Sequence, residues 1–152
     1  MGMFTAINIA ATGMTAERLR QDVIADNIAN VDTTRTPEGG AYKRSRVVLE
    51  PITDTPYFRL PFLPDEWDGG AGNGVRVSEI QKDTATASRY VYDPTHPDAI
   101  LSGPYEGYVE YPNVNIVTEM VDLIAASRAY EANAQIVNGA KSMFLKALEI
   151  GR

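Results

Sequence analysis

The residues best suited to catalysis or metal binding are few in this 152-residue chain. Its single histidine, His96, lies between Pro94 and Pro97 in YDPTHPDA, a pattern typical of a turn. A catalytic or metal-binding histidine needs partners at a useful spacing, and only Asp93 and Asp98 are close in sequence. The pattern therefore favours a turn residue over a ligand or a general base.

A second candidate is the acidic segment DEWDGGAGNG, where Asp65, Glu66 and Asp68 surround Trp67. These side chains could bind a cation or a sugar. The segment lacks the alternating oxygen ligands and the closing glutamate of a calcium loop. Its glycines precede the strand-like VRVSEI rather than a helix, unlike those of a phosphate-binding loop. We interpret it as an exposed acidic loop and keep a small sugar- or cation-binding module as the less favoured alternative.

Charge and composition argue against several other functions. The net charge is −6, with the acidic excess in residues 61–112, so we predict no nucleic-acid binding. The sequence contains no cysteine and shows no catalytic triad or metal-ligand cluster, so we predict no enzyme activity, no metal and no cofactor. The N-terminus lacks the pattern of a cleaved signal peptide, and no apolar run is long enough for a transmembrane segment. The basic cluster Lys43, Arg44 and Arg46 fits a solvated strand face or, alternatively, a partner-binding patch.

Helical periodicity marks both ends of the chain. Apolar residues recur every three or four positions from Met3 to about Ala29, which predicts a long N-terminal helix. A second helix is predicted over 116–148, where Asn115 can cap the first amides. Large side chains recur there every seven residues between alanines, as in closely packed helices. Spacing alone favours an internal core for this stripe, but apolar positions also lie off it and leave intermolecular packing open.

The middle of the chain alternates with a period of two. YKRSRVVLE, VRVSEI, ASRYVY and GYVEY read as short strands bounded by glycine and proline. The expected fold class is α+β, with long N- and C-terminal helices pairing as a coiled-coil-like domain and a small β-rich middle region. We divide the chain into residues 1–33 for the N-terminal helix, 34–112 for the middle and 113–152 for the C-terminal helix.

The two ends together resemble a known family. INIAATGMTAERLRQDVIADNIANVDTTRTPEGGAYKR and GYVEYPNVNIVTEMVDLIAASRAYEANAQIVNGAKSMFLKALEIG are similar to the bacterial flagellar basal-body rod proteins. The Asn-Ile-Ala-Asn run at 27–30 has the form shared by rod and hook proteins, whereas DTTRTPEGGAYKR and YPNVN point to a proximal rod subunit. The chain departs from the family pattern at 51–74 and at ILSGPYE.

This resemblance implies a structural subunit of the proximal rod that polymerises helically through its terminal helices and transmits torque as part of the drive shaft. It implies export by the flagellar type III apparatus without a cleaved signal, and assembly in the periplasm. The implied partners are other rod proteins, the rod-to-ring adaptor, the inner-membrane ring protein and further copies of this chain. A soluble coiled-coil adaptor with a single partner remains the alternative.

The predicted assembly interface lies on the two terminal helices. Asn27 and Asn30 are expected to adopt unusual backbone angles and to cap the fraying helix, or else to bond to a neighbouring subunit. Gly39 and Gly40 are expected to reverse the chain. The interface residues are Ile7, Met14, Ile24, Asn27, Ile28, Asn30, Leu123, Tyr130, Val137 and Phe144.

Overall fold

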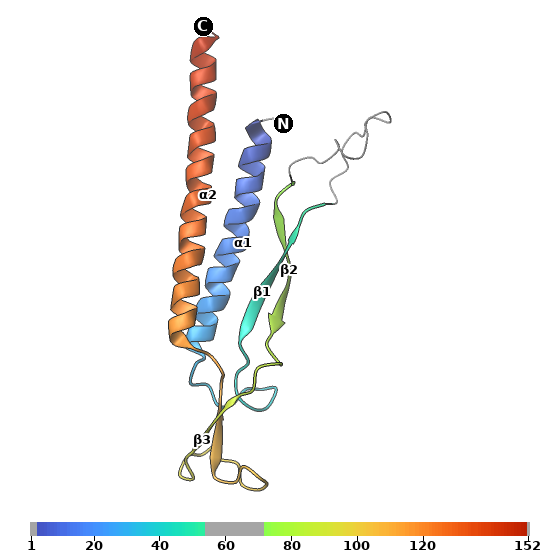
Figure 1. Ribbon diagram of the computed structural model, residues 1–152, viewed down its shortest axis with the longest axis vertical. Coiled ribbons are helices and arrows are strands. Elements are labelled where there is room, and N and C mark those ends of the chain that lie inside the picture. The colour runs from blue at the N-terminus through green and yellow to red at the C-terminus, as the bar shows by residue number, and fades with distance from the viewer. Residues whose placement is uncertain (1–2, 54–71, 152) are drawn as a thin grey trace. The chain divides into compact units, whose positions relative to one another are not determined.

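The computed structural model describes residues 3–53 and 72–151 (Figure 1). In these residues two long helices flank four strands along the sequence, so the α+β content is confirmed. The C-terminal helix ends two residues beyond the predicted end at 148. The elements are α1 (Met3–Ala29), β1 (Ser45–Pro51), β2 (Val75–Lys82), β3 (Arg89–Tyr92), β4 (Tyr108–Tyr111) and α2 (Ile116–Ile150).

The helix ends follow from local hydrogen bonding. At the start of α2, Asn115 Oδ1 accepts hydrogen bonds from the N–H groups of Val117 and Thr118, at 3.0 and 3.4 Å, so the predicted cap is confirmed. At the end of α1, the Asn30 N–H and Nδ2 both donate to the Asp26 carbonyl. The prediction of unusual backbone angles at Asn27 and Asn30 is wrong, because no non-glycine residue among those described has a positive φ.

The strands form two separate two-stranded sheets, β1 with β2 and β3 with β4. In the second sheet the strands are antiparallel, and Val91 pairs with Val109. Val109 is fully buried. The chain reversal predicted at Gly39 and Gly40 is confirmed, since their φ angles are 89° and 76°.

The described chain divides into two compact units, each assembled from segments that are distant in sequence. The first combines residues 3–18, 48–53, 72–79 and 127–151. The second combines residues 19–47 and 80–126. Each unit mixes terminal and middle segments, and the predicted division at 33 and 112 stays a prediction.

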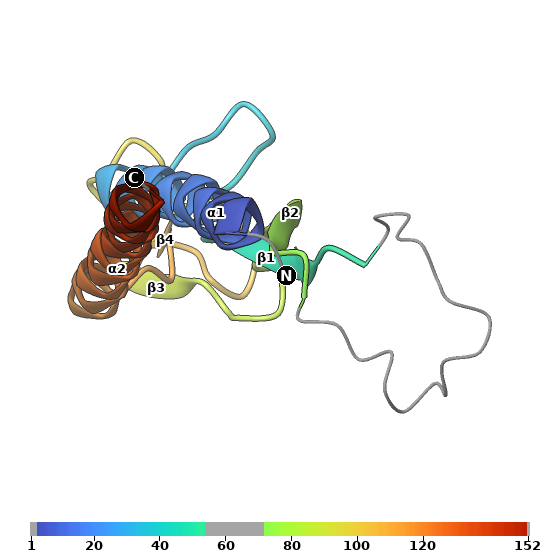
Figure 2. The ribbon, with the colours of Figure 1, turned by 90° about the horizontal axis from the view of Figure 1, so that it is seen from above.

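In the first unit, the first half of α1 lies between the C-terminal part of α2 and the β1–β2 pair (Figures 1 and 2). The ring centroids of Phe4 and Phe144 are 6.4 Å apart. On the strand side, Thr12 Oγ1 accepts a hydrogen bond from the Val75 N–H at 3.2 Å. Small side chains permit this close packing: Ala10 and Ala140 are both buried. These contacts do not establish a continuous heptad seam, so coiled-coil pairing stays a prediction.

The buried apolar residues of the second unit include Ile24, Val47, Val109 and Ala126. Ion pairs and hydrogen bonds hold its loops. Lys82 Nζ lies 2.7 Å from both carboxylate oxygens of Glu38, and this hydrogen bond and charge lower the pKa of the Glu38 carboxyl.

Candidate functional site

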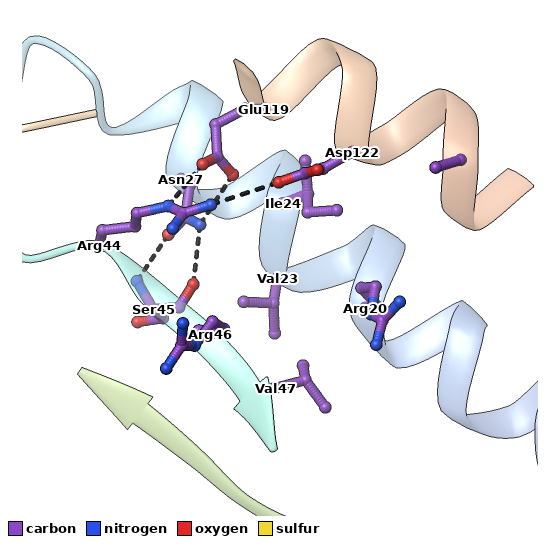
Figure 3. Close-up of a pocket in the computed structure, with 11 residues that line it drawn as sticks. Arg20, Val23, Ile24, Asn27, Arg44, Ser45, Arg46, Val47, Glu119 and Asp122 are labelled. Carbon is purple, nitrogen blue, oxygen red and sulfur yellow. Dashed lines mark hydrogen bonds and ion pairs between the residues drawn. The ribbon is translucent and has the colours of Figure 1, made fainter. Parts of the chain in front are cut away.

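A buried polar cluster in the second unit joins α1, β1 and α2 (Figure 3). Its centre is Asn27, in the last turns of α1, which is only 1% exposed. Asn27 Oδ1 accepts the Ser45 N–H at 2.9 Å, and Asn27 Nδ2 donates to the Ser45 carbonyl at 2.9 Å. The amide therefore pairs with the first residue of β1 as a neighbouring strand would.

The same amide also reaches the second helix. Asn27 Nδ2 donates its other proton to Glu119 Oε2 at 3.1 Å, across 92 residues of sequence. Both amide protons are thus used, a condition that a buried asparagine must meet to avoid a desolvation cost. We call Asn27, Arg44, Ser45 and Glu119 the polar clamp.

Glu119 brings a buried charge into the polar clamp. Its side chain is 1% exposed, and its Oε1 accepts a charge-assisted hydrogen bond from Arg44 Nε at 2.6 Å. Arg44 extends further along α2, where its Nη2 lies 3.4 Å from Asp122 Oδ2. A buried carboxylate is tolerated only when it is paired and hydrogen-bonded, and Glu119 has both a cation and an amide donor.

Tyr42 makes a further hydrogen-bond contact with the polar clamp. Its hydroxyl lies 2.9 Å from Asp26 Oδ2 and 3.0 Å from Asn27 Oδ1, and its single proton can be donated to only one of them at a time. Burial raises the pKa of Tyr42 above its ordinary value, and the hydrogen bond to Asp26 adds to this effect. The hydroxyl therefore stays protonated as a donor at neutral pH.

Beside the polar clamp is a hollow of about 220 Å³. Val23, Ile24 and Val47 line it with apolar groups, while Arg20 and Arg46 supply cations (Figure 3). No group of three or more histidine, aspartate or glutamate side chains suited to a metal ion occurs among the described residues. The hydrogen bonds and the ion pair of the polar clamp connect α1, the start of β1 and α2.

The predicted interface residues have different surroundings. Asn27 and Ile24 are buried in the second unit, whereas Tyr130 and Phe144 are 39% and 41% exposed. Asn30 bonds locally, since its Nδ2 donates to the Asp26 carbonyl and carboxylate. The half-buried members are Ile7, Met14, Ile28, Asn30, Leu123 and Val137. Whether these residues form an assembly interface stays a prediction.

The sequence interpretation missed Ser45 and Glu119 as partners of Asn27, and it missed Arg44 as the partner of Glu119. Arg44 belonged to a basic cluster that was expected on a solvated strand face, and its pairing with Glu119 corrects this expectation for that residue. The position of Glu119, four residues before the apolar Leu123 and seven before the apolar Ala126, could have indicated a buried role.

Other sequence candidates are accounted for locally. His96 lies in a turn, as predicted, where its Nδ1 accepts the Asp98 N–H at 3.1 Å. The acidic group of Asp65, Glu66, Trp67 and Asp68 lies outside the described residues. Neither described helix is long and apolar enough to cross a membrane.

Comparisons with known proteins match both ends of the chain. Residues 7–35 match the family model described as flagella basal body rod protein, and residues 105–150 match the flagellar basal body rod FlgEFG protein C-terminal. Asn27 falls in the first match and Glu119 in the second.

Relatives that align over nearly the whole chain are named flagellar basal-body rod protein FlgC. The chain is 57% identical over 150 residues to the flagellar basal-body rod protein FlgC of Borreliella burgdorferi, which covers 99% of this chain and 98% of that protein. It is 42% identical over 156 residues to FlgC of Bacillus subtilis and 35% identical over 152 residues to FlgC of Salmonella typhimurium, with each chain covered completely.

Proposed function

This chain belongs to the flagellar basal-body rod protein family, and from that premise we propose that it is a structural subunit of the proximal rod of a bacterial flagellum. It polymerises helically through its terminal helices into a segment of the drive shaft that transmits torque. It has no catalytic role.

The observation that carries this proposal is the apolar surface of α2. Monomeric proteins rarely leave a large contiguous apolar surface in water, and such a surface is typical of an interaction site. The large apolar side chains of α2 with more than a third of their surface exposed are Ile116, Val117, Met120, Val121, Ile124, Tyr130, Ile136, Met143, Phe144, Leu145, Leu148 and Ile150. Neighbouring subunits would cover them in a rod.

The polar clamp suits this role because it fixes the first turns of α2 against the end of α1 and the start of β1. Buried charge networks can specify one arrangement of packed segments, which is our interpretation for Arg44 and Glu119. A subunit that passes load to its neighbours needs such a defined junction. Each subunit then presents the same surface to the next, as a head-to-tail assembly requires.

The family premise also supports a cellular setting. We place the chain in the basal body, in the periplasm, after export by the flagellar type III apparatus without a cleaved signal peptide. Its proposed neighbours are other rod proteins, the rod-to-ring adaptor, the inner-membrane ring protein and further copies of itself.

Deletion of the gene in the source bacterium, followed by return of an epitope-labelled copy, tests the proposal. We expect the deletion to abolish rods and motility, and the returned protein to be recovered in purified basal bodies. Complete rods in the deletion strain would refute it. A one-to-one soluble complex with a single partner, absent from basal bodies, would instead favour the coiled-coil adaptor.

A further inference from the structure

We propose that the outer edge of β3 binds an extended segment of a different protein, one that carries basic side chains, by adding it as a third strand to the β3–β4 sheet. The proposal adds a partner surface to the proposed function and rests on the backbone hydrogen bonding of the second unit.

In an antiparallel pair of strands, the backbone N–H and C=O groups of successive residues point alternately toward the partner strand and away from it. The Asp93 N–H donates to the Gly107 carbonyl at 3.0 Å, which makes this residue pair a hydrogen-bonded pair of the antiparallel ladder. Pairs alternate along such a ladder, and Tyr92 is paired with Tyr108 and Tyr90 with Glu110. The N–H and C=O groups of Tyr90 and Tyr92 therefore point away from β4.

The opposite edge shows the same parity, and at Tyr108 it is paired with the loop that precedes β4. The Tyr108 N–H donates to the Tyr105 carbonyl at 3.0 Å, and the Tyr108 carbonyl accepts the Ile100 N–H at 3.0 Å. Within residues 3–53 and 72–151, no hydrogen bond beyond the ladder reaches the backbone of Tyr90 or Tyr92. Among the described residues, the outer edge of β4 is thus paired with its own loop at Tyr108, whereas the outer edge of β3 has no backbone partner at Tyr90 or Tyr92.

Exposure distinguishes this edge from an ordinary solvated loop. All four residues of β3 are exposed, including Val91 at 38% and Tyr92 at 65%. Tyr90 is 41% exposed although its ring stacks on Tyr105 at 4.6 Å between centroids. An open edge with aromatic and β-branched side chains is a template for pairing with another strand. Exposed tyrosines also supply large contact areas at protein interfaces.

Charge indicates the kind of segment that fits. Between residues 83 and 111 the only lysine or arginine is Arg89, whose guanidinium already lies 5.5 Å from the centre of the Tyr111 ring. The hydroxyl and N–H of Thr95 hold the pKa of Asp93, next to Tyr92, below its usual value. The acidic residues of this stretch are Asp83, Asp93, Asp98, Glu106 and Glu110. Basic side chains of a partner can pair with such carboxylates and lie over tyrosine rings.

A second copy of the chain fits less well. Two β3 edges paired with each other would bring their acidic surroundings together. Such a contact would also use the same patch on both subunits and close a two-fold dimer, whereas a growing rod needs an interface that does not close. We therefore commit to a different protein with a basic extended segment.

The test places a photo-reactive phenylalanine analogue at Tyr90 in the full chain, expressed in the source bacterium in place of the native copy. Irradiation of whole cells should give an adduct with another protein, mapped to an extended segment that contains lysine or arginine. A second change at Tyr92 then separates backbone pairing from side-chain contact. Tyr92→Thr removes the ring and keeps the N–H, whereas Tyr92→Pro removes both.

Proline is tolerated at an edge position whose N–H faces outward, so Tyr92→Pro should leave β3–β4 intact. We expect it to lower the adduct yield about tenfold or more, since it deletes one hydrogen bond and blocks the edge, while Tyr92→Thr lowers the yield much less. Amide exchange at Val91 and Val109 in the purified variants checks the sheet. Should Tyr92→Pro disturb it, Tyr90→Pro with the photo-reactive group at Tyr92 makes the same comparison.

An adduct only with a second copy, the absence of any adduct, or equal loss in the proline and threonine variants would overturn the proposal. The unmodified chain's presence in basal bodies is scored separately. Its absence there would refute the proposed function, whereas its presence without a Tyr90 adduct would refute only the edge pairing.

Discussion

Asn27 and Asn30 lie three positions apart, yet Asn30 makes local hydrogen bonds and Asn27 bonds to segments that are distant in sequence. Asn30 bonds back to Asp26 at the end of its own helix. Asn27 uses both amide protons and its oxygen on Ser45 and Glu119, and its side chain is buried. This contrast makes Asn30 a matched control for Asn27.

We predict that Asn27→Ala lowers the free energy of unfolding by about 3 kcal/mol, because it leaves the Ser45 backbone groups and a Glu119 oxygen without a partner in a buried site. Asn30→Ala should cost less than about 1 kcal/mol, since water can replace its bonds. Urea unfolding of the two purified variants measures both. Equal losses would mean that Asn27 is no more than a helix cap.

Arg44 and Arg46 provide a second matched pair. Arg44→Met keeps the length of the side chain but leaves Glu119 as a buried carboxylate without its cation, at an expected cost of about 3–5 kcal/mol. Arg46 is exposed, and Arg46→Met should change stability by less than about 0.5 kcal/mol.

Adding Glu119→Gln to Arg44→Met removes the unpaired charge and should recover part of the loss in urea unfolding. If the two arginine variants are equally stable, or if the double change lowers stability further, the Arg44–Glu119 ion pair does not compensate the buried charge of Glu119.

At the scale of elements, the approach of β2 to α1 depends on one glycine. Gly74 has a φ of 106°, which disfavours other residues, and a Cβ there would collide with Thr12 Oγ1. The same threonine oxygen accepts the Val75 N–H. A side chain at position 74 would therefore disturb both the turn and the anchoring of the strand.

Gly74→Ala should lower the free energy of unfolding by about 2 kcal/mol, through backbone strain and the clash with Thr12. At Gly72, two residues earlier, an added Cβ would meet no atom within 4 Å, and Gly72→Ala should stay within about 0.5 kcal/mol. Thermal or urea unfolding of both variants decides the matter. A Gly74→Ala protein as stable as the Gly72 variant would contradict the assigned contact.

Periodicity predicted the elements well because their signals are local. The step of three or four residues from Met3 to Ala29 and the cap at Asn115 depend on neighbours in sequence, and both are confirmed. The polar clamp depends on partners up to 92 residues apart. Nothing in the local pattern of Arg44 separates it from Arg46, so only the folded arrangement shows which of the two is paired.

The same limit applies to the strands. YKRSRVVLE and VRVSEI were recognisable from their alternation, but their separation from the β3–β4 sheet follows from tertiary pairing. The open edge of β3 likewise results from hydrogen-bond parity, which sequence composition does not encode.

At the scale of the whole molecule, the subunit leaves apolar side chains exposed along α2. Tyr130 is 39% exposed, so a charge there should alter monomer stability by less than about 1 kcal/mol. In a rod, however, we expect neighbouring subunits to cover it, where an unpaired carboxylate costs several kcal/mol.

Tyr130→Asp should therefore abolish rod assembly and motility while the purified subunit remains folded. Gln135→Asp places the same carboxylate at an exposed polar position of α2 and should be tolerated. Swimming assays and electron microscopy of basal bodies distinguish the variants. Normal motility with Tyr130→Asp would count against a buried interface at this position.

We infer that this chain is a rod subunit whose exposed α2 surface is covered by its neighbours. An electron cryo-microscopy map of the native basal body, with side-chain detail, would show whether this is so. We expect repeated copies of the chain in helical order within the rod, with Met120, Ile124 and Tyr130 buried against adjacent subunits and the polar clamp intact. A rod without this chain, or copies whose α2 apolar side chains face water, would contradict it.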